Sequence, residues 1–322
     1  MNIISERYAR FKHEQAERYN TRKKEFKEGI RLAKRNYIGF VFLAPFLTLF
    51  FTFTILPVFM AIFYSFTDFN ILQRANFIGL RNYVQLFLHD DVFITAIRNT
   101  FVFAVVTGPI GYILSLLVAW FINELHPRFR AVMILLFYAP SISGQAFLIW
   151  RIMFSSDAYG YINSLLLRFN LINNPIQFME DPTYILPIVI LVSLWLSLGT
   201  GFLAFVAGLQ GIDRTLYEAG SVDGIRNRWQ ELWFITLPSM RPQLMFGAVI
   251  SITTAFAVFD VSVAMAGFPS VQYSAHTVLT HLVDYGTIRF EMGYASTIAV
   301  FLFFVMVGSN KLVNKYLRKI GT

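Results

Sequence analysis

Six apolar stretches, each long enough to cross a lipid bilayer, constrain the fold of this chain more than any other feature of its sequence. A transmembrane helix needs about 20 predominantly apolar residues, and the hydrocarbon core offers no partner for an unpaired backbone group. We therefore predict an all-α membrane protein with six transmembrane helices. The expected spans are residues 38–65, 100–122, 131–153, 184–209, 244–265 and 294–313.

The composition agrees with a membrane protein. Hydrophobic residues make up 56% of the 322 residues and charged residues 14%, whereas a soluble domain carries about 25% charged residues. The basic residues flank the apolar stretches, so the net charge of +8 indicates contact with a membrane surface rather than with nucleic acid. The chain contains no cysteine, which excludes disulfides and thiolate metal sites.

The distribution of Lys and Arg predicts the orientation, because the cytoplasmic flanks of membrane spans are enriched in both. With the N-terminus in the cytoplasm, every lysine and most arginines fall on the cytoplasmic side. We therefore expect both termini to be cytoplasmic. The arginines left on the opposite side are Arg74, Arg81, Arg98, Arg151, Arg168 and Arg289.

The chain is expected to fall into three segments. Residues 37–315 form one membrane domain, and residues 316–322 form a cytoplasmic tail. Residues 1–36 are rich in Arg, Lys and Glu, with apolar residues at nearly helical spacing. This segment is either an amphipathic helix on the membrane surface or a solvated tail whose charges set the topology.

The one long cytoplasmic loop, residues 210–243, has a sequence that predicts short helices. Asp213 can cap the first helix, whose apolar face would carry Leu216, Ala219 and Val222. Gly224 then ends this helix, because glycine tolerates the positive φ of a tight turn.

A second amphipathic stretch follows in the same loop. Leu237-Pro238 would end it, and Pro242 would begin the next span. Apolar faces in the cytoplasm either dock onto a partner or lie back on the protein's own helix ends or the bilayer interface. The residues expected on one side of this stretch are Trp229, Leu232, Trp233 and Thr236.

The sequence EAGSVDG at residues 218–224, followed by ITLP at residues 235–238, resembles the EAA motif of the permease subunits of ABC importers. The resemblance implies that the loop is a coupling helix seated in a cleft of a separate ATPase. Glu218 would then approach a basic residue of the ATPase, and Gly220 stands where the family usually has alanine. The implied coupling residues are Glu218, Ala219, Gly220, Asp223, Gly224, Leu237 and Pro238.

Other stretches resemble the oligosaccharide branch of the type I ABC importers, which includes maltose, glycerol-phosphate and alginate systems. The resemblance implies the type I permease fold and half of a pathway for an oligosaccharide, with an acidic one such as an alginate fragment as a specific option. It also implies a homologous second permease, two ATP-binding subunits, a solute-binding protein and a bacterial inner membrane. The stretches are FTDF at 66–69, FIGLRNY at 77–83, FD at 259–260, GFP at 267–269 and MGYAS at 292–296.

The chain carries no motif for catalysis or metal binding. It has no glycine-rich loop ending in Lys and Ser or Thr, so ATP and Mg would be bound by partner subunits. It has neither a G-x-S-x-G motif nor a pair of carboxylates at catalytic spacing, and we expect no enzyme activity, cofactor or metal in this chain. Its histidines, expected in tails or loops without metal-ligand spacing, are His13, His89, His126, His276 and His281.

The main alternative is a secondary transporter or channel subunit without ATP coupling. It would need buried ionisable residues for ion coupling, and the spans are almost free of them. A membrane-embedded enzyme would need a catalytic constellation, and a structural scaffold would leave the loop 210–243 without a partner.

Polar side chains within the spans are candidates for the transport pathway, because such groups usually face a bundle interior or a water-filled cavity. The alternative is that the Ser and Thr side chains bond helix backbones and that Trp lies at an interface. Helix breaks are expected at Pro140, Gly144, Pro187 and Gly201. The pathway candidates are Gln145, Ser193, Trp195, Ser197, Ser251, Thr253 and Asp260.

Overall fold

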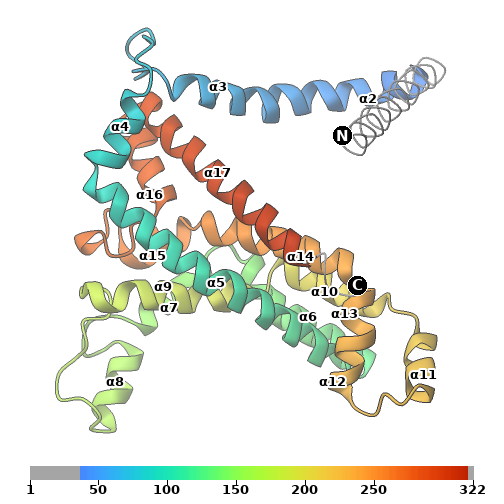
Figure 1. Ribbon diagram of the computed structural model, residues 1–322. Helices are drawn as coiled ribbons and strands as arrows, with labels where there is room; N and C mark the ends of the chain where they lie inside the picture. The colour runs from blue at the N-terminus through green and yellow to red at the C-terminus, as the bar shows by residue number, and fades with distance from the viewer. Residues whose placement is uncertain (1–36, 318–322) are drawn as a thin grey trace, which may run out of the picture. The chain divides into compact units, whose positions relative to one another are not determined.

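Helices account for all regular secondary structure in residues 37–317, the part of the chain that the computed structural model describes (Figure 1). The predicted all-α class is therefore confirmed. The chain divides into two units, residues 1–60 and residues 61–322. The segment 1–36 lies outside the described residues, as do residues 318–322 of the expected tail, so the expected roles of both segments stay predictions.

The first unit contributes most of one long apolar helix. It consists of α2 (Tyr37–Phe50), a π-helical turn η1 (Phe51–Ile55) and α3 (Leu56–Tyr64), which runs into the second unit. These 28 residues are long and apolar enough to span a membrane. Phe42 is 82% exposed, and apolar side chains of this kind suit contact with hydrocarbon.

The second unit contains the remaining helices, with the two π-helical turns η2 (Leu232–Thr236) and η4 (Asp284–Ile288) and a 3-10 turn η3 (Val271–Tyr273). Its α-helices are α4 (Arg81–Leu88), α5 (Asp91–Asn123), α6 (Pro127–Ile142), α7 (Phe147–Met153), α8 (Tyr161–Arg168), α9 (Pro182–Leu196), α10 (Thr200–Gln210), α11 (Arg214–Val222), α12 (Arg228–Glu231), α13 (Leu237–Ser239), α14 (Arg241–Phe256), α15 (Asp260–Ala266), α16 (Val278–Val283) and α17 (Met292–Leu317).

The predicted number of spans agrees with the described helices. Five stretches are long and apolar enough to cross a membrane, and α6 with α7 forms a sixth that bends by 80°. Gly144, between α6 and α7, has a φ of +68°, which glycine adopts without steric cost. The break predicted in this span is confirmed there.

The break in the fourth span lies elsewhere than predicted. The α9 helix continues through Pro187 and ends at Leu196, and α10 begins at Thr200. Gly201 lies inside α10, where a Cβ atom would stand 3.8 Å from the Cα of Gly247. Gly201 therefore lies where α10 packs on α14 and does not mark the break.

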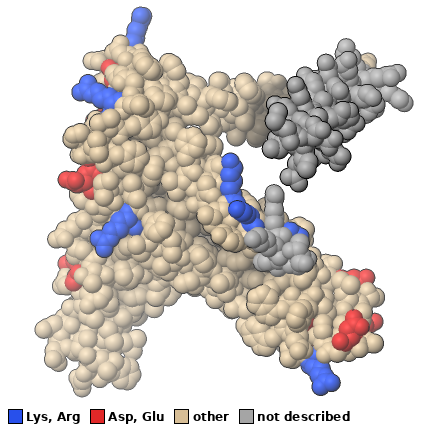
Figure 2. Space-filling view, in the orientation of Figure 1, with Lys and Arg blue, Asp and Glu red and all other residues tan. Residues whose placement is uncertain are grey.

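Two ends of the second unit are distinct in Figure 1. One end carries α11 and α12, and the opposite end carries α4, α8 and α16. The loop 210–243 and the segments expected outside the cytoplasm thus lie at opposite ends of the spans, as the charge pattern predicts. Figure 2 shows that acidic and basic side chains are sparse on the viewed face between them.

The α5 helix is central to the packing of this unit. It contacts α9, α10, α14 and α16, and its residues take part in three separate clusters of buried apolar side chains. A single helix of 33 residues thus connects the two ends of the unit.

Candidate functional site

A cavity of about 520 Å³ lies among the broken helices of the second unit. It is bordered by α5 and by the breaks between α6 and α7, between α9 and α10, and between α14 and α15. A volume of this size is typical of small-molecule sites, which range from about 300 to 1,000 Å³. The helix breaks thus open a polar space inside an otherwise apolar bundle.

Five of the predicted pathway residues line this cavity, and two do not. The lining ones are Ser193, Ser197, Ser251, Thr253 and Asp260.

The other two candidates lie beside the cavity. Gln145 is exposed, although its neighbours Gly144 and Ala146 are part of the lining. The Trp195 ring packs edge-on against Trp150, with ring centroids 5.6 Å apart. Neither residue lines the cavity: Gln145 falls in the break between α6 and α7, and Trp195 faces Trp150.

The hydroxyl groups of the lining fall into two classes. Thr253 donates to the carbonyl of Val249 at 2.8 Å, and Ser197 donates to the carbonyl of Leu194 at 2.7 Å. These two therefore make the helix-backbone bonds that the alternative interpretation predicts. The Ser193 Oγ, by contrast, is buried without a hydrogen-bond partner among the described residues.

Besides these hydroxyl groups, the cavity lining contains aromatic side chains and almost no charge. Asp260, exposed at the start of α15, is the one charged side chain among the described lining residues. Hydroxyl and aromatic groups together suit a ligand that presents both hydroxyls and apolar faces. The aromatic lining residues are Phe103, Tyr138, Phe147, Phe205 and Phe259.

The loop 210–243 folds at the α11 end much as its local sequence predicts. The Asp213 carboxylate caps α11 by accepting from the backbone N–H of Thr215 at 3.0 Å. Gly224 has a φ of +93° and turns the chain. Asn227 then caps α12 by accepting from the N–H of Gln230 at 2.9 Å.

The apolar face of α11 has no cover within the described chain. Leu216 is 46% exposed and Val222 is 86% exposed, and Ala219 and Glu218 are exposed as well. This half of the loop therefore does not lie back on the protein's own helix ends.

The second half of the loop differs from the prediction. Leu232 and Thr236 are buried, whereas Trp233 is 63% exposed. Leu232 packs into the cluster that contains Trp120 and Leu209, and Trp233, the next residue in η2, faces away from it. Leu237 and Pro238 open the short helix α13 and do not themselves end the stretch, which continues to Ser239.

Gly220 has a packing reason at its position in α11. A Cβ atom there would stand 2.6 Å from the Cδ1 of Ile235. The glycine lets α11 approach η2 closely, and the Tyr217 hydroxyl bonds the Thr236 hydroxyl at 2.9 Å across the same contact.

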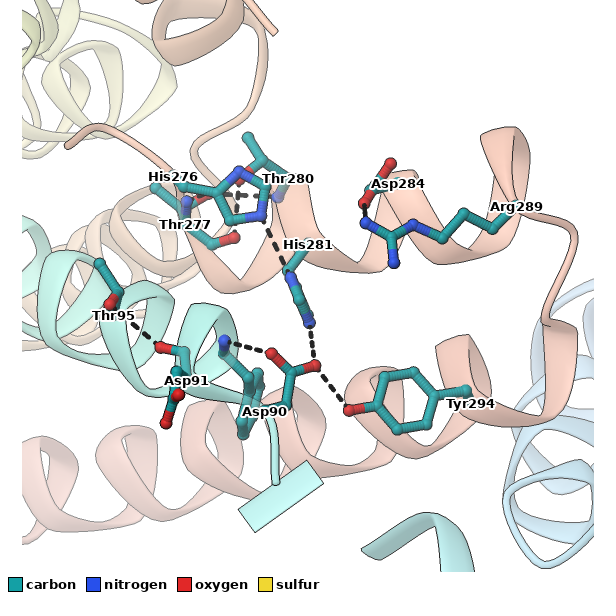
Figure 3. Close-up of polar contacts among 11 residues, drawn as sticks. Asp90, Asp91, Thr95, His276, Thr277, Thr280, His281, Asp284, Arg289 and Tyr294 are labelled. Atoms are coloured by element: carbon teal, nitrogen blue, oxygen red, sulfur yellow. Dashed lines mark hydrogen bonds and ion pairs between the residues drawn. The ribbon is translucent and has the colours of Figure 1, made fainter. Parts of the chain in front are cut away.

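A second polar cluster lies at the α16 end (Figure 3), and of its members only Tyr294 belongs to a stretch that the sequence analysis singled out. The Asp90 carboxylate accepts from the Tyr294 hydroxyl at 2.7 Å, from the Phe93 N–H at 2.8 Å and from Nε2 of His281 at 3.0 Å. Burial opposes ionisation of Asp90, but the hydrogen bonds from His281, Tyr294 and Phe93 outweigh it and lower its pKa to about 2.

The cluster extends to a second histidine. Nδ1 of His281 lies 3.1 Å from Nε2 of His276. Because the Asp90 carboxylate can only accept, Nε2 of His281 is the donor in their contact. Burial, together with the nearby His281, lowers the pKa of His276 to about 4.

These positions correct part of the expectation for the histidines. His281 lies inside α16 and is buried rather than in a loop, and His276 is buried in the segment before that helix. His13 lies outside the described residues. Within the described chain, no group of three or more His, Asp or Glu residues could hold a metal ion.

Comparison with known proteins decides the family. No family model matches the chain. The probable ABC transporter permease protein YesP of Bacillus subtilis is 32% identical over 296 residues, covering 89% of this chain and 92% of YesP. The chain belongs to the ABC transporter permease family. The lactose transport system permease protein LacF of Rhizobium radiobacter is 30% identical to the permease over 224 residues, which cover 69% of this chain and 74% of LacF.

Solved structures share the fold of the permease. One chain in the crystal structure of a bacterial ABC transporter that imports the acidic polysaccharide alginate superposes with a TM-score of 0.74. The alignment covers 90% of this chain and 98% of that chain, at 24% sequence identity. A second structure, of a bacterial alginate ABC transporter in complex with a periplasmic protein that holds an alginate pentasaccharide, gives a TM-score of 0.72. The expected importer-permease fold is thus confirmed.

Proposed function

We propose that this permease is one of two membrane subunits of an ATP-driven importer and forms half of the pathway for an oligosaccharide. The observation that carries the proposal is the arrangement within one unit of a hydroxyl- and aromatic-lined cavity and, at the α11 end, an uncovered apolar helix. The cavity fits a sugar, and the uncovered helix fits an ATPase surface. Family membership supports both assignments.

Carbohydrate as the substrate class draws further support from the relatives. LacF is named for lactose, and AraP of Bacillus subtilis, 28% identical over 270 residues, is named for arabinooligosaccharides.

An acidic oligosaccharide is a second candidate, favoured by the start of α10. Gly199, Thr200 and Gly201 line the cavity, and no side chain caps this helix. Uncapped backbone N–H groups at a helix start attract carboxylate and hydroxyl oxygens alike. The charge of Asp260 acts against an anion. Uptake of a neutral and a uronate oligosaccharide of equal length, measured side by side, separates the two candidates.

The proposed assembly contains a homologous second permease, two ATP-binding subunits and a solute-binding protein. ATP and Mg²⁺ would be held by the ATP-binding subunits, because this chain has no phosphate-binding loop. The side of the membrane at which α11 lies would be the cytoplasm, in agreement with the basic residues at that end.

The proposed mechanism is alternating access, in which the cavity opens to one side of the membrane at a time. Closure of the ATP-binding subunits would move α11, and the three helix breaks around the cavity would allow the spans to reorient. The chain itself performs no catalysis in this scheme.

Reconstitution tests the proposal. The permease would be purified with the permease and ATPase encoded beside it and placed in proteoliposomes with the solute-binding protein. We expect uptake that requires ATP. Glu218→Ala and Gly224→Pro should each reduce uptake at least tenfold, because the first removes the docking carboxylate and the second cannot adopt a φ of +93°.

The control is Glu180→Ala. This exposed acidic residue lies outside residues 210–243, which we call the docking loop. It should leave uptake unchanged. Uptake driven by an ion gradient without ATP would support the secondary-transporter alternative, and unchanged ATPase assembly in both docking variants would refute the coupling role.

A further inference from the structure

An arginine of the docking loop is bound to the end of the central helix α5. The Arg228 Nη2 lies 2.9 Å from Oε2 of Glu124, which directly follows α5, and its Nη1 lies 2.8 Å from Oε2 of Glu231. Beside this ion pair, the Trp229 ring packs against the Trp120 ring of α5 in a tilted arrangement, with ring centroids 5.2 Å apart. Two adjacent residues of α12 thus hold α5 at its last turn.

The same helix borders the cavity through Gly111 and Ser115, which precede Trp120 in its C-terminal half. The Ser115 hydroxyl donates to the carbonyl of Ser197 at 3.1 Å. A Cβ atom on Gly111 would stand 3.0 Å from the Cβ of Ser197. Ser197 directly follows the last residue of α9 and lines the cavity. A movement of α5 therefore acts directly on the break between α9 and α10.

We propose that Arg228 is a positioning residue that fixes the docking loop to α5, so that α5 carries the displacement of the loop to the cavity. This inference rests on the proposed function, because it assumes that an ATPase moves the loop. A packed helix that contacts the loop at its last turn and the cavity further back is the kind of contiguous element through which two sites can be coupled.

The fold also connects the loop to the cavity through α14, and the experiment must distinguish transmission through α5 from transmission through α14. The loop continues through α13 directly into α14, whose residues Ser251 and Thr253 also line the cavity. If α14 alone carried the movement, the contact between Arg228 and Glu124 would be dispensable.

Apolar packing supplies most of the stability of the loop, so the loop does not need the ion pair to fold. Leu232, Leu237 and Met240 are buried in one cluster with Trp120 and Leu209. The ion pair is largely exposed, with 63% of the Arg228 side chain and 41% of the Glu124 side chain accessible. Exposed pairs contribute little to stability, so their removal should leave the fold and the docking surface intact.

The experiment measures ATP hydrolysis and uptake together in proteoliposomes of the complete transporter. The single variants are Arg228→Met and Glu124→Gln. The third variant exchanges the two charges, Arg228→Glu with Glu124→Arg. It also carries Glu231→Gln, because a glutamate at position 228 would otherwise repel Glu231. We expect the two single variants to keep ATP hydrolysis and to lose at least about fivefold in sugar transported per ATP, the lower limit of typical coupling between sites. The exchanged pair should recover most of the loss relative to Glu231→Gln alone.

Two further comparisons separate loss of the ion pair from misfolding of the loop. Arg228→Lys retains the charge and should show a smaller loss. Glu124→Gln changes α5 and not the loop, so its effect cannot come from a misfolded docking surface. Unchanged transport per ATP in both Arg228→Met and Glu124→Gln, or a loss that the exchanged pair does not repair, would overturn the inference. Absence of ATP-dependent uptake in the unmodified transporter would instead refute the proposed function.

Discussion

Asp90 and His281 are 191 residues apart in the sequence, yet Oδ2 of Asp90 lies 3.0 Å from Nε2 of His281 in the interior of the protein (Figure 3). Their contact joins the start of α5 to α16, and the Tyr294 hydroxyl adds α17 to the same carboxylate. Three elements that meet at the α16 end are thus held by one ionised side chain.

Asp90→Asn should destabilise the permease strongly. The amide oxygen can replace only one of the two carboxylate oxygens, so its NH2 group must face either the Phe93 N–H or the His281 and Tyr294 donors. A buried donor left unsatisfied in this way costs about 1–3 kcal/mol. Thermal unfolding of the purified protein in detergent measures the effect. The matched control is Asp91→Asn, because Asp91 is the exposed neighbour in the first turn of α5. Equal melting temperatures for the two variants would contradict the assigned role of Asp90.

The stability of the permease should fall as the pH is lowered from about 6.5 to 4. The pKa of His276 is lowered from 6.5 to about 4, so in this window the unfolded chain binds a proton that the folded protein does not. The free energy of unfolding then decreases with falling pH, by up to about 1.4 kcal/mol per unit for this one group.

Asp90 acts in a separate, more acidic window. Its pKa is lowered from 3.8 to about 2, so its stabilising contribution is complete above about pH 4 and is lost as the pH falls toward 2. Melting temperature measured against pH distinguishes the two groups. His276→Gln should flatten the curve between pH 6.5 and 4, whereas the exposed control His126→Gln should leave its shape unchanged.

Gly220→Ala should weaken the docking loop even though the related motif usually has alanine there. The added methyl group would meet Ile235, which must shift, and overpacking of this kind costs about 1–3 kcal/mol. Co-purification with the ATPase reports the loss. Ile235→Val in the same chain should restore binding by removing the opposing methyl, and the exposed Ser221→Ala should have no effect. A double variant no better than Gly220→Ala would argue against this contact.

Ser193→Ala distinguishes a ligand-binding hydroxyl from a structural one. The Ser193 Oγ is buried and has no hydrogen-bond partner in the part of the chain that the structure describes, so its removal should leave the fold as stable as before or slightly more stable. If the hydroxyl binds the sugar, the KM for uptake should rise about fivefold, the equivalent of one hydrogen bond of about 1 kcal/mol. Ser143→Ala, exposed and bonded to the carbonyl of Pro140, is the control. An unchanged KM would remove Ser193 from the pathway.

The predicted orientation can be read by cysteine labelling, because the chain has no cysteine of its own. Val222→Cys lies in the docking loop and Tyr159→Cys lies at the opposite end, and these positions are 86% and 92% exposed. A membrane-impermeant thiol reagent added to intact spheroplasts should label position 159 and not position 222. The reverse pattern would place α11 outside the cytoplasm and exclude its contact with an ATPase.

The spans and the first half of the docking loop follow directly from the sequence. Apolar length fixes a membrane helix because no other structure satisfies the backbone in hydrocarbon. Asp213 and Gly224 act within a few residues of their own positions, one as a cap and one as a turn, so their roles are readable from neighbouring residues.

Tertiary structure alone decided which side chains reach the cavity and which residues meet at the α16 end. Ser193 lines the cavity and Trp195 does not, because the break falls after Leu196 and not at Pro187. Leu232 is buried and its neighbour Trp233 is exposed, because packing against Trp120 and Leu209 covers only one face of this stretch. The contact between Asp90 and His281 has no local signal at all, since it forms only when helices from distant parts of the chain pack together.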